Sequence, residues 1–211
     1  MSGDLKLNPL ELDALREVGN MGAGRAATAL SQMLGQTIRI SVPKASIIRL
    51  EDLPDPLGGP DAIVAATYFR VYGDAPGRLL IFLTQETLPH VLTMLTGKAP
   101  RPGAPLSAEE QSALKELGNI LCSQYLNALA DLMKIQMLPS VPALAFDMVR
   151  SVMQSVMADV SEHSSQALLI ENQFVEADRP VALYLFYLPE ANSLEGMLAL
   201  LAKVTGTDLR A

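Results

Sequence analysis

Two short polar motifs in this sequence have the residue types and the spacing to hold a reactant. Glu17 precedes Asn20 by three positions, and Glu116 precedes Asn119 by three positions further along the chain. Residues three apart lie on one face of a helix, so each Glu and its Asn can reach the same target. The Glu carboxylate can pair with a lysine or act as a base, and the Asn carboxamide offers a donor and an acceptor on one planar group.

The carboxamide of Asn is suited to holding a water molecule in a fixed orientation, and it is not suited to nucleophilic attack or to taking protons. Hydrolysis of an already activated phosphoryl group needs little more than a positioned water, because positioning and electrostatics do nearly all the work. The sequence offers no metal-ligand cluster, Ser-His-Asp set or Cys-His pair that competes with this interpretation. We therefore treat both motifs as candidate hydrolytic sites.

The two motifs belong to a longer repeat, which indicates internal duplication. Residues 13–20 read DALREVGN and residues 112–119 read SALKELGN, so five of the eight positions are identical. After 22 further residues, each Asn is followed by the proline of a Ser-Val-Pro tripeptide, Pro43 or Pro142. A shared motif at a shared offset from a second motif is typical of a duplicated structural unit.

Each motif is expected to lie on a long amphipathic helix. Asn8 and Ser107 stand at N-cap positions, and Glu11 and Glu110 follow three residues later, as a capping box requires. The first helix is predicted to end at Gly35. At 100° per residue, small and apolar residues form one stripe on each helix, and the polar residues of the motif form a row on the opposite face. These polar rows are Asp13, Glu17 and Asn20 in the first helix, and Ser112, Glu116 and Asn119 in the second.

The residues after each helix alternate in a way that predicts strands and hairpins. In the first half we expect a strand over residues 37–42 that ends at Pro43, a hairpin of residues 62–71 and 78–83, and a helix from Thr84 to Gly97. In the second half we expect a strand over residues 135–138, a hairpin of residues 167–174 and 181–188, and a helix over residues 193–204. Residues 143–160 are predicted to form an additional helix that the first half lacks.

These elements predict an α+β fold, an internally duplicated domain with pseudo-twofold symmetry in which helices pack on an antiparallel β-sheet. A single domain is expected over residues 1–211. Its first half spans residues 8–97 and its second half spans residues 107–206. Residues 98–106, which are rich in proline, are expected to link the halves. The symmetry predicts that the two polar rows lie on equivalent, separate surfaces.

Composition excludes several classes of function. The chain has 211 residues, of which 49% are apolar, which is enough for a sizeable core. The net charge of −7, without a basic cluster, argues against binding to nucleic acid or to an anionic membrane surface. The single Cys122 excludes an internal disulfide and fits a reducing compartment. No segment is apolar for long enough to span a bilayer, so a cytoplasmic protein is expected.

The repeated motifs resemble those of the CheC family, whose members are phosphatases of the chemotaxis response regulator CheY and are related to CheX and to the flagellar switch phosphatase FliY. The resemblance rests on both E-x-x-N motifs, on Asp13 and Ser112 four positions before each Glu, on the Gly-Asn junctions and on the two prolines. It covers nearly the whole chain.

The resemblance implies a role for each motif residue. Glu17 and Glu116 would pair with the active-site lysine of phosphorylated CheY, and Asn20 and Asn119 would orient the water that attacks the aspartyl phosphate. Asp13 and Ser112 would support these pairs. The chain would need no cofactor of its own, because CheY would hold the Mg²⁺. The resemblance also implies that the helix after the second proline binds the receptor deamidase CheD, with Asp147 at the contact.

Two other functions remain open from the sequence. The chain could be a non-catalytic adaptor that binds a phosphorylated receiver, CheD or a flagellar switch complex. It could also be a structural oligomerisation domain, which would not bind a receiver. Both E-x-x-N motifs are complete, and this favours the phosphatase.

Overall fold

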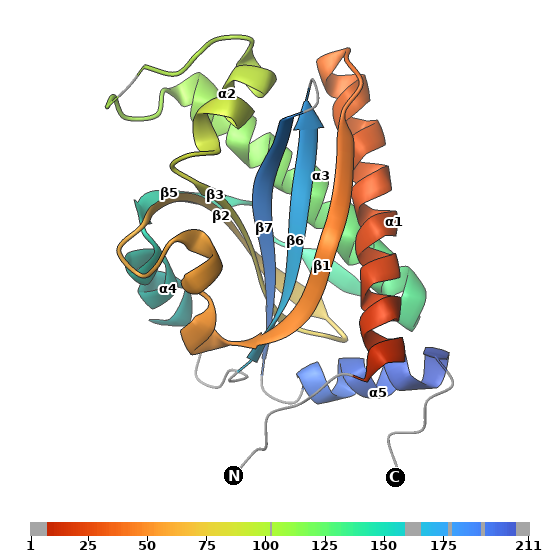
Figure 1. Ribbon diagram of the computed structural model, residues 1–211. Helices are drawn as coiled ribbons and strands as arrows, with labels where there is room; N and C mark the ends of the chain where they lie inside the picture. Colours follow the sequence, from red (N-terminus) through yellow and green to blue (C-terminus); the bar gives the residue numbers. More distant parts are fainter. Residues whose placement is uncertain (1–7, 102, 159–165, 177–178, 191–192, 206–211) are drawn as a thin grey trace.

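The protein is built around one antiparallel sheet with helices on both faces (Figure 1). The computed structural model describes residues 8–101, 103–158, 166–176, 179–190 and 193–205. Within these ranges the sheet has seven strands. The α+β fold with an antiparallel sheet, predicted from the sequence, is confirmed.

The elements follow one another in a similar order in the two halves of the chain. The helices are α1 (Pro9–Leu34), α2 (Leu88–Thr96), α3 (Ala108–Met133), α4 (Val149–Ala158) and α5 (Ser193–Thr205), with two short 3₁₀ turns, η1 (Leu50–Asp52) and η2 (Asp55–Leu57). The strands are β1 (Arg39–Arg49), β2 (Ile63–Gly73), β3 (Gly77–Thr84), β4 (Met137–Pro139), β5 (Ala143–Met148), β6 (Gln166–Glu176) and β7 (Arg179–Pro189).

The sheet interleaves strands from the two halves. Its order is β1-β6-β7-β3-β2-β4, and β5 also pairs with β2. The two hairpins, β2–β3 and β6–β7, form the centre, where β3 lies beside β7. The first strand of each half crosses over, because β1 pairs with β6 of the second half, whereas β4 and β5 pair with β2 of the first half. Each half therefore completes its sheet with a strand from the other.

Capping boxes begin both long helices, as the sequence predicted. The Asn8 side chain accepts a hydrogen bond from the Glu11 N–H, and the Glu11 carboxylate accepts one from the Asn8 N–H. Ser107 and Glu110 repeat this arrangement in α3. The hydrogen bonds that Ser107 donates lower the pKa of the Glu110 carboxyl. Gly35 ends α1 in the left-handed conformation, also as predicted.

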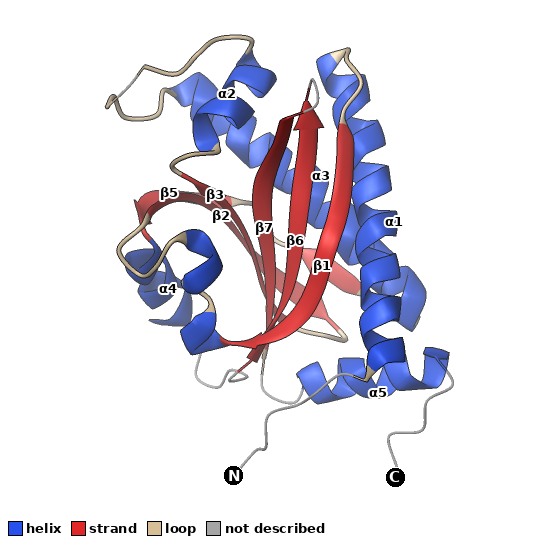
Figure 2. Ribbon diagram, in the orientation of Figure 1, coloured by secondary structure: helices blue, strands red, loops and turns tan. Residues whose placement is uncertain are grey.

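Helices cover both faces of the sheet (Figure 2), and buried side chains on the two faces form separate apolar cores. The larger core lies between one face and α1, α2, α3 and α5. The smaller core lies under α4 and the two 3₁₀ turns on the other face. Alternating residues of β7 illustrate the division, because Leu185 and Tyr187 belong to the larger core and Phe186 and Leu188 to the smaller. The sheet is thus buried on both faces at its centre.

The prediction that Pro43 ends the first strand was wrong. Strand β1 continues through Pro43 to Arg49, and its register with β6 shifts between Ser41 and Lys44. Proline lacks the N–H that a ladder needs, so it is tolerated in strands at edges and bulges. β1 lies at the edge of the sheet, and its register with β6 is irregular at the proline. Pro43 is therefore accommodated without the loss of a regular ladder hydrogen bond.

The additional helix predicted over residues 143–160 is shorter than expected. Residues Ala143–Met148 form β5, which pairs with β2 through six residues, and only Val149–Ala158 form α4. A short apolar run is compatible with either strand or helix. Here residues 143–148 form a strand because they hydrogen-bond to the otherwise unpaired edge of β2. Residues 159 and 160 lie outside the described part of the chain.

Both hairpins and the last helix lie where the sequence predicted them. The helix predicted to open at Thr84 begins instead at Leu88, because Thr84 and Thr87 bond to each other in a turn. Residues 177–178 and Gly206, expected in a turn and at a helix end, are outside the described residues. None of the described helices combines the length and the apolar character needed to span a bilayer.

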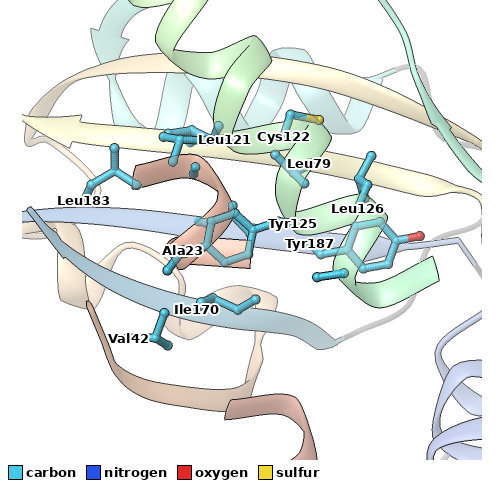
Figure 3. Packing of buried hydrophobic residues seen from close by; sticks show 14 of the residues in the cluster. Ala23, Val42, Leu79, Leu121, Cys122, Tyr125, Leu126, Ile170, Leu183 and Tyr187 are labelled. Carbon is cyan, nitrogen blue, oxygen red and sulfur yellow. The ribbon is translucent and has the colours of Figure 1, made fainter. Parts of the chain in front are cut away.

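Helices α1 and α3 approach each other closely where α1 has a glycine. A Cβ atom added to Gly22 would lie 3.1 Å from Tyr125 Cα and 2.9 Å from its Cδ1. Figure 3 shows Tyr125 inside the larger core, beside Ala23 of α1. The Tyr125 hydroxyl donates to Asn172 of β6, which ties the crossing point to the sheet. Gly24, two residues further along α1, is exposed and faces open space.

Substitution of Gly22 by Ala is therefore expected to destabilise the protein. The new methyl group would push against the backbone of α3, and overpacking of this kind costs about 1–3 kcal/mol in the free energy of unfolding. Gly24→Ala is the matched control and should stabilise the protein by about 0.5–1 kcal/mol, because Ala favours the helix and meets nothing there. Urea unfolding of the two variants measures both effects. Equal stability of the two variants would contradict the close approach at Gly22.

Candidate active site

The two polar rows occupy equivalent positions on α1 and α3. Both helices have 26 residues and start from a capping box, so the N-cap fixes where each row begins. Glu17 is nine residues after Asn8, and Glu116 is nine residues after Ser107. Each Asn follows its Glu by three residues and shares its helix face. The local geometry of the two candidate sites is therefore repeated by the backbone itself.

All six side chains of the polar rows reach the surface. Asp13, Glu17, Asn20, Ser112 and Glu116 are exposed, and Asn119 is half-buried. In the part of the chain that the structure describes, their side-chain polar atoms make no hydrogen bond or ion pair with protein groups. The carboxylates and carboxamides are thus available to bind groups of a partner.

Each Asn is held by a segment that lies directly on the sheet. Gly19 precedes Asn20, and a Cβ atom added to it would lie 3.1 Å from Val42 Cγ1 of β1. Gly118 precedes Asn119, and its added Cβ would lie 2.6 Å from Thr67 Cγ2 of β2. Both glycines are buried against the sheet, so they face away from any partner of the Asn. They anchor the helix and leave the Asn on its outer face.

Other kinds of catalytic centre find no support in the described residues. No group of three or more His, Cys, Asp or Glu side chains is arranged there to hold a metal ion. Cys122 is fully buried, and burial raises the pKa of its thiol, so it is protonated and inaccessible at neutral pH. The polar rows, by contrast, bring Glu, Asn, Asp and Ser side chains to the surface of two helices.

The polar rows lie on helix faces and not in a small-molecule cleft. A hollow of about 460 Å³ lies between α5 and the β2–β3 turn, where Asp74, Ile135, Met197 and Lys203 contribute to its lining. None of the six polar-row residues lines it. An exposed face of a rigid helix suits a protein substrate that brings its own reactive group to it.

Asp147 lies apart from both rows, and it is not on a helix. It is exposed on β5, and its Oδ1 accepts a hydrogen bond of 2.7 Å from the Met148 N–H. The helix α4 begins two residues later, at Val149. The neighbouring Phe146 is 48% exposed. Successive side chains of a strand point to opposite faces of the sheet, so its ring and the Asp147 carboxylate lie on opposite faces of β5.

The attachment of α4 to the rest of the fold was not predicted from the sequence. The N–H groups of Val149 and Arg150 donate to the carbonyls of Ala62 and Pro60, and the Arg150 guanidinium pairs with Asp61 at 2.7 Å. These contacts join the additional helix of the second half to a loop of the first half. The loop is irregular and its partner is distant in sequence, so neither periodicity nor spacing could have indicated the contact.

Comparison with known proteins places these features in context. The model of the CheC-like family matches residues 10–47 and 109–145, which are the two motif helices and the strands that follow. CheY-P phosphatase CheC of Bacillus subtilis is 34% identical over 195 residues, which cover 90% of this chain and 93% of that protein. The putative CheY-P phosphatase CheC1 of Halobacterium salinarum is 23% identical and covers 89% and 94% of the two chains.

The fold is also found in a solved structure. The crystal structure of Thermotoga maritima FliY superposes with a TM-score of 0.73 at 19% identity, covering 95% of this chain and all of that one. The likeness to FliY shows a shared fold, and the identity to the Bacillus protein over nearly the full length of both chains shows the family. The chain belongs to the CheC-like family.

Proposed function

We propose that this chain is a phosphatase that hydrolyses the aspartyl phosphate of phosphorylated CheY in the cytoplasm. The observation that carries the proposal is the duplicated Glu–Asn pair, which reaches the surface on two helices and has no protein partner in the described part of the chain. The 34% identity to a CheY-P phosphatase supports the same activity and the same substrate.

The Asn of each pair acts on the attacking water. The carboxamide of Asn20, or of Asn119 in the second site, holds the water in line with the phosphorus–oxygen bond of the acyl phosphate. The water oxygen forms a bond to phosphorus, the bond to the aspartyl oxygen breaks, and its electrons return to the carboxylate. The products are inorganic phosphate and free aspartate, and the water proton leaves with the phosphate or to solvent. Removal of one group positioned for the transition state typically costs about 10²–10³-fold in rate.

The Glu of each pair fixes the substrate against the helix. Glu17 or Glu116 pairs with the active-site lysine of the receiver, so that the phosphoryl group comes to lie beside the Asn. Because the two residues are three apart on one rigid helix, the lysine and the water are held at a fixed separation. Asp13 and Ser112, one turn before each Glu, support the pair by shaping the polar surface around it.

The chain needs no metal of its own under this proposal. The Mg²⁺ that neutralises charge on the phosphoryl group is expected to be bound by CheY. The polar rows hold two carboxylates on α1, Asp13 and Glu17, and one on α3, Glu116, and the described residues include no group of three or more acids arranged to hold an ion. The protein would therefore contribute an amide and a carboxylate to a centre whose remaining parts come with the substrate.

Simultaneous substitution Asn20→Ala and Asn119→Ala is expected to lower the rate of CheY dephosphorylation by about 100-fold or more. Each single variant should retain activity through the other site. The decay of phosphate on a purified receiver, with catalytic amounts of the protein, measures the effect. Asn127→Ala, which removes an exposed Asn from α3 outside the motif, is the control and should leave the rate unchanged.

Two results would reject this assignment. An unaltered rate in the double variant would show that the carboxamides do not position the water. Binding of the phosphorylated receiver without any acceleration of its decay by the unmodified protein would identify a non-catalytic adaptor instead.

We further propose that the edge formed by β5 and α4 binds the deamidase CheD, with Asp147 at the contact. The exposed carboxylate of Asp147 offers a charged contact, and the exposed ring of Phe146 offers an apolar contact on the opposite face of the same strand. The half-buried Met153 and Met157 of α4 pack against the smaller core and leave part of their flexible side chains at the surface. In the first half, residues 44–49 of β1 occupy the corresponding place in the sheet, but two short 3₁₀ turns follow them where α4 follows β5.

Asp147→Ala is expected to weaken CheD binding by about tenfold, because truncation of an interface residue that matters costs more than 1 kcal/mol. Titration of CheD, followed by calorimetry, measures the affinity. Glu195→Ala removes an exposed carboxylate from α5, away from this edge, and should not change the affinity. If both variants bind CheD as the unmodified protein does, the deamidase contact does not involve Asp147.

A further inference from the structure

Two apolar side chains stand exposed beside the first polar row. Leu10 is 54% exposed and Met21 is 42% exposed, both on α1. Large apolar residues on a helix normally turn toward the core, and those of α1 that face the sheet are fully buried. The exposed pair is therefore separate from the packing of α1 in the fold.

Leu10 and Met21 bracket the candidate catalytic pair. At 100° per residue, Leu10, Glu17 and Met21 fall within an arc of about 40° on the helix. Along the axis, the rise of about 1.5 Å per residue separates Leu10 from Met21 by roughly 16 Å, with Glu17 and Asn20 between them. Met21 directly follows Asn20. The polar row thus has an apolar contact at each end.

The second half of the chain does not repeat this arrangement. The residue equivalent to Leu10 is Glu109, which is exposed and pairs with Lys98 at 3.1 Å. The residue equivalent to Met21 is Ile120, which is half-buried. One site is bordered by exposed apolar groups and the other by an ion pair, although both carry the same Glu and Asn.

We propose that Leu10 and Met21 bind the phosphorylated receiver at the first site and make that site the one with the higher affinity. The inference rests on the proposed function, which supplies the occupant. A partner that places its phosphoryl group at Asn20 covers the surface around it, and an ordinary interface of about 800 Å² per partner is roughly 30 Å across. Both apolar side chains lie within that area.

The residues that surround each site predict which of the two sites binds the receiver more tightly. A receiver that covers Leu10 and Met21 removes apolar surface from water, which strengthens binding. A receiver that covers Glu109 and Lys98 must instead remove water from two charges. The attraction within an exposed ion pair of this kind is too weak to offset that desolvation cost. The first site should therefore have the lower KM, whereas the rate of the chemical step should be similar.

The test isolates each site. In the Asn119→Ala background only the first site is intact, and there Leu10→Ala with Met21→Ala is expected to raise the KM for phosphorylated receiver by about tenfold or more, with kcat unchanged. In the Asn20→Ala background only the second site is intact, and the same two substitutions should leave KM unaltered. Met33→Ala is the matched control, because Met33 is 44% exposed on the same helix but lies three turns beyond the motif.

A binding measurement separates this inference from the proposed phosphatase activity. The receiver loaded with beryllium fluoride, a stand-in for the phosphoryl group, is titrated into the same variants. If the Leu10/Met21 and Met33 variants both turn over substrate, with the same KM and the same affinity, the docking role is overturned and the proposed phosphatase activity is retained. Affinity lowered in the Leu10/Met21 variant alone, with no turnover in any variant, would support the docking role and reject the phosphatase.

Discussion

The contact between each motif helix and the sheet is the constraint on which the candidate sites depend. At Gly19 and Gly118 the helix backbone rests on Val42 and Thr67, with no side chain between them. A third contact without a side chain, at Gly22, brings α1 against the backbone of Tyr125. A helix fixed at these points has little freedom to rotate or shift. The next residue, Asn20 or Asn119, is then presented on the outer face in a defined direction, which is what a group that orients water requires.

This arrangement divides the chemistry between two proteins. The chain offers a carboxamide and a carboxylate on a convex surface, and the described residues include neither a metal cluster nor a reactive thiol. Every other component of the proposed reaction arrives with the substrate. Under the proposed function, such a surface acts on a protein whose own active site is already assembled. Specificity would then lie in the fit between two folded surfaces, and side chains outside the reacting atoms, such as Leu10 and Met21, would contribute to it.

Local signals in the sequence predicted the features that depend on local interactions. The capping boxes at Asn8 and Ser107 and the exposure of both polar rows follow from hydrogen bonding and periodicity within one helix. Features set by distant partners could not be found in this way. The passage of β1 through Pro43 depends on its place at the sheet edge, and the strand at Ala143–Met148 depends on the open edge of β2. A helical wheel could have placed Leu10 and Met21 on the outer face of α1. The difference between the two sites becomes clear only when these residues are compared with Glu109 and its ion-pair partner Lys98 at the second site.

The exchange of strands between the halves has a consequence for the order of folding. Strand β1 pairs with β6, whose residues are synthesised more than a hundred positions later. The apolar residues of α1 and β1 therefore leave the ribosome long before the strand that covers them, and the sheet closes only after β7 is complete. Pairing over such distances slows folding and prolongs the exposure of unpaired edges. A second copy of the chain carries the same strands, so exchange of strands between two copies competes with pairing within one copy during synthesis.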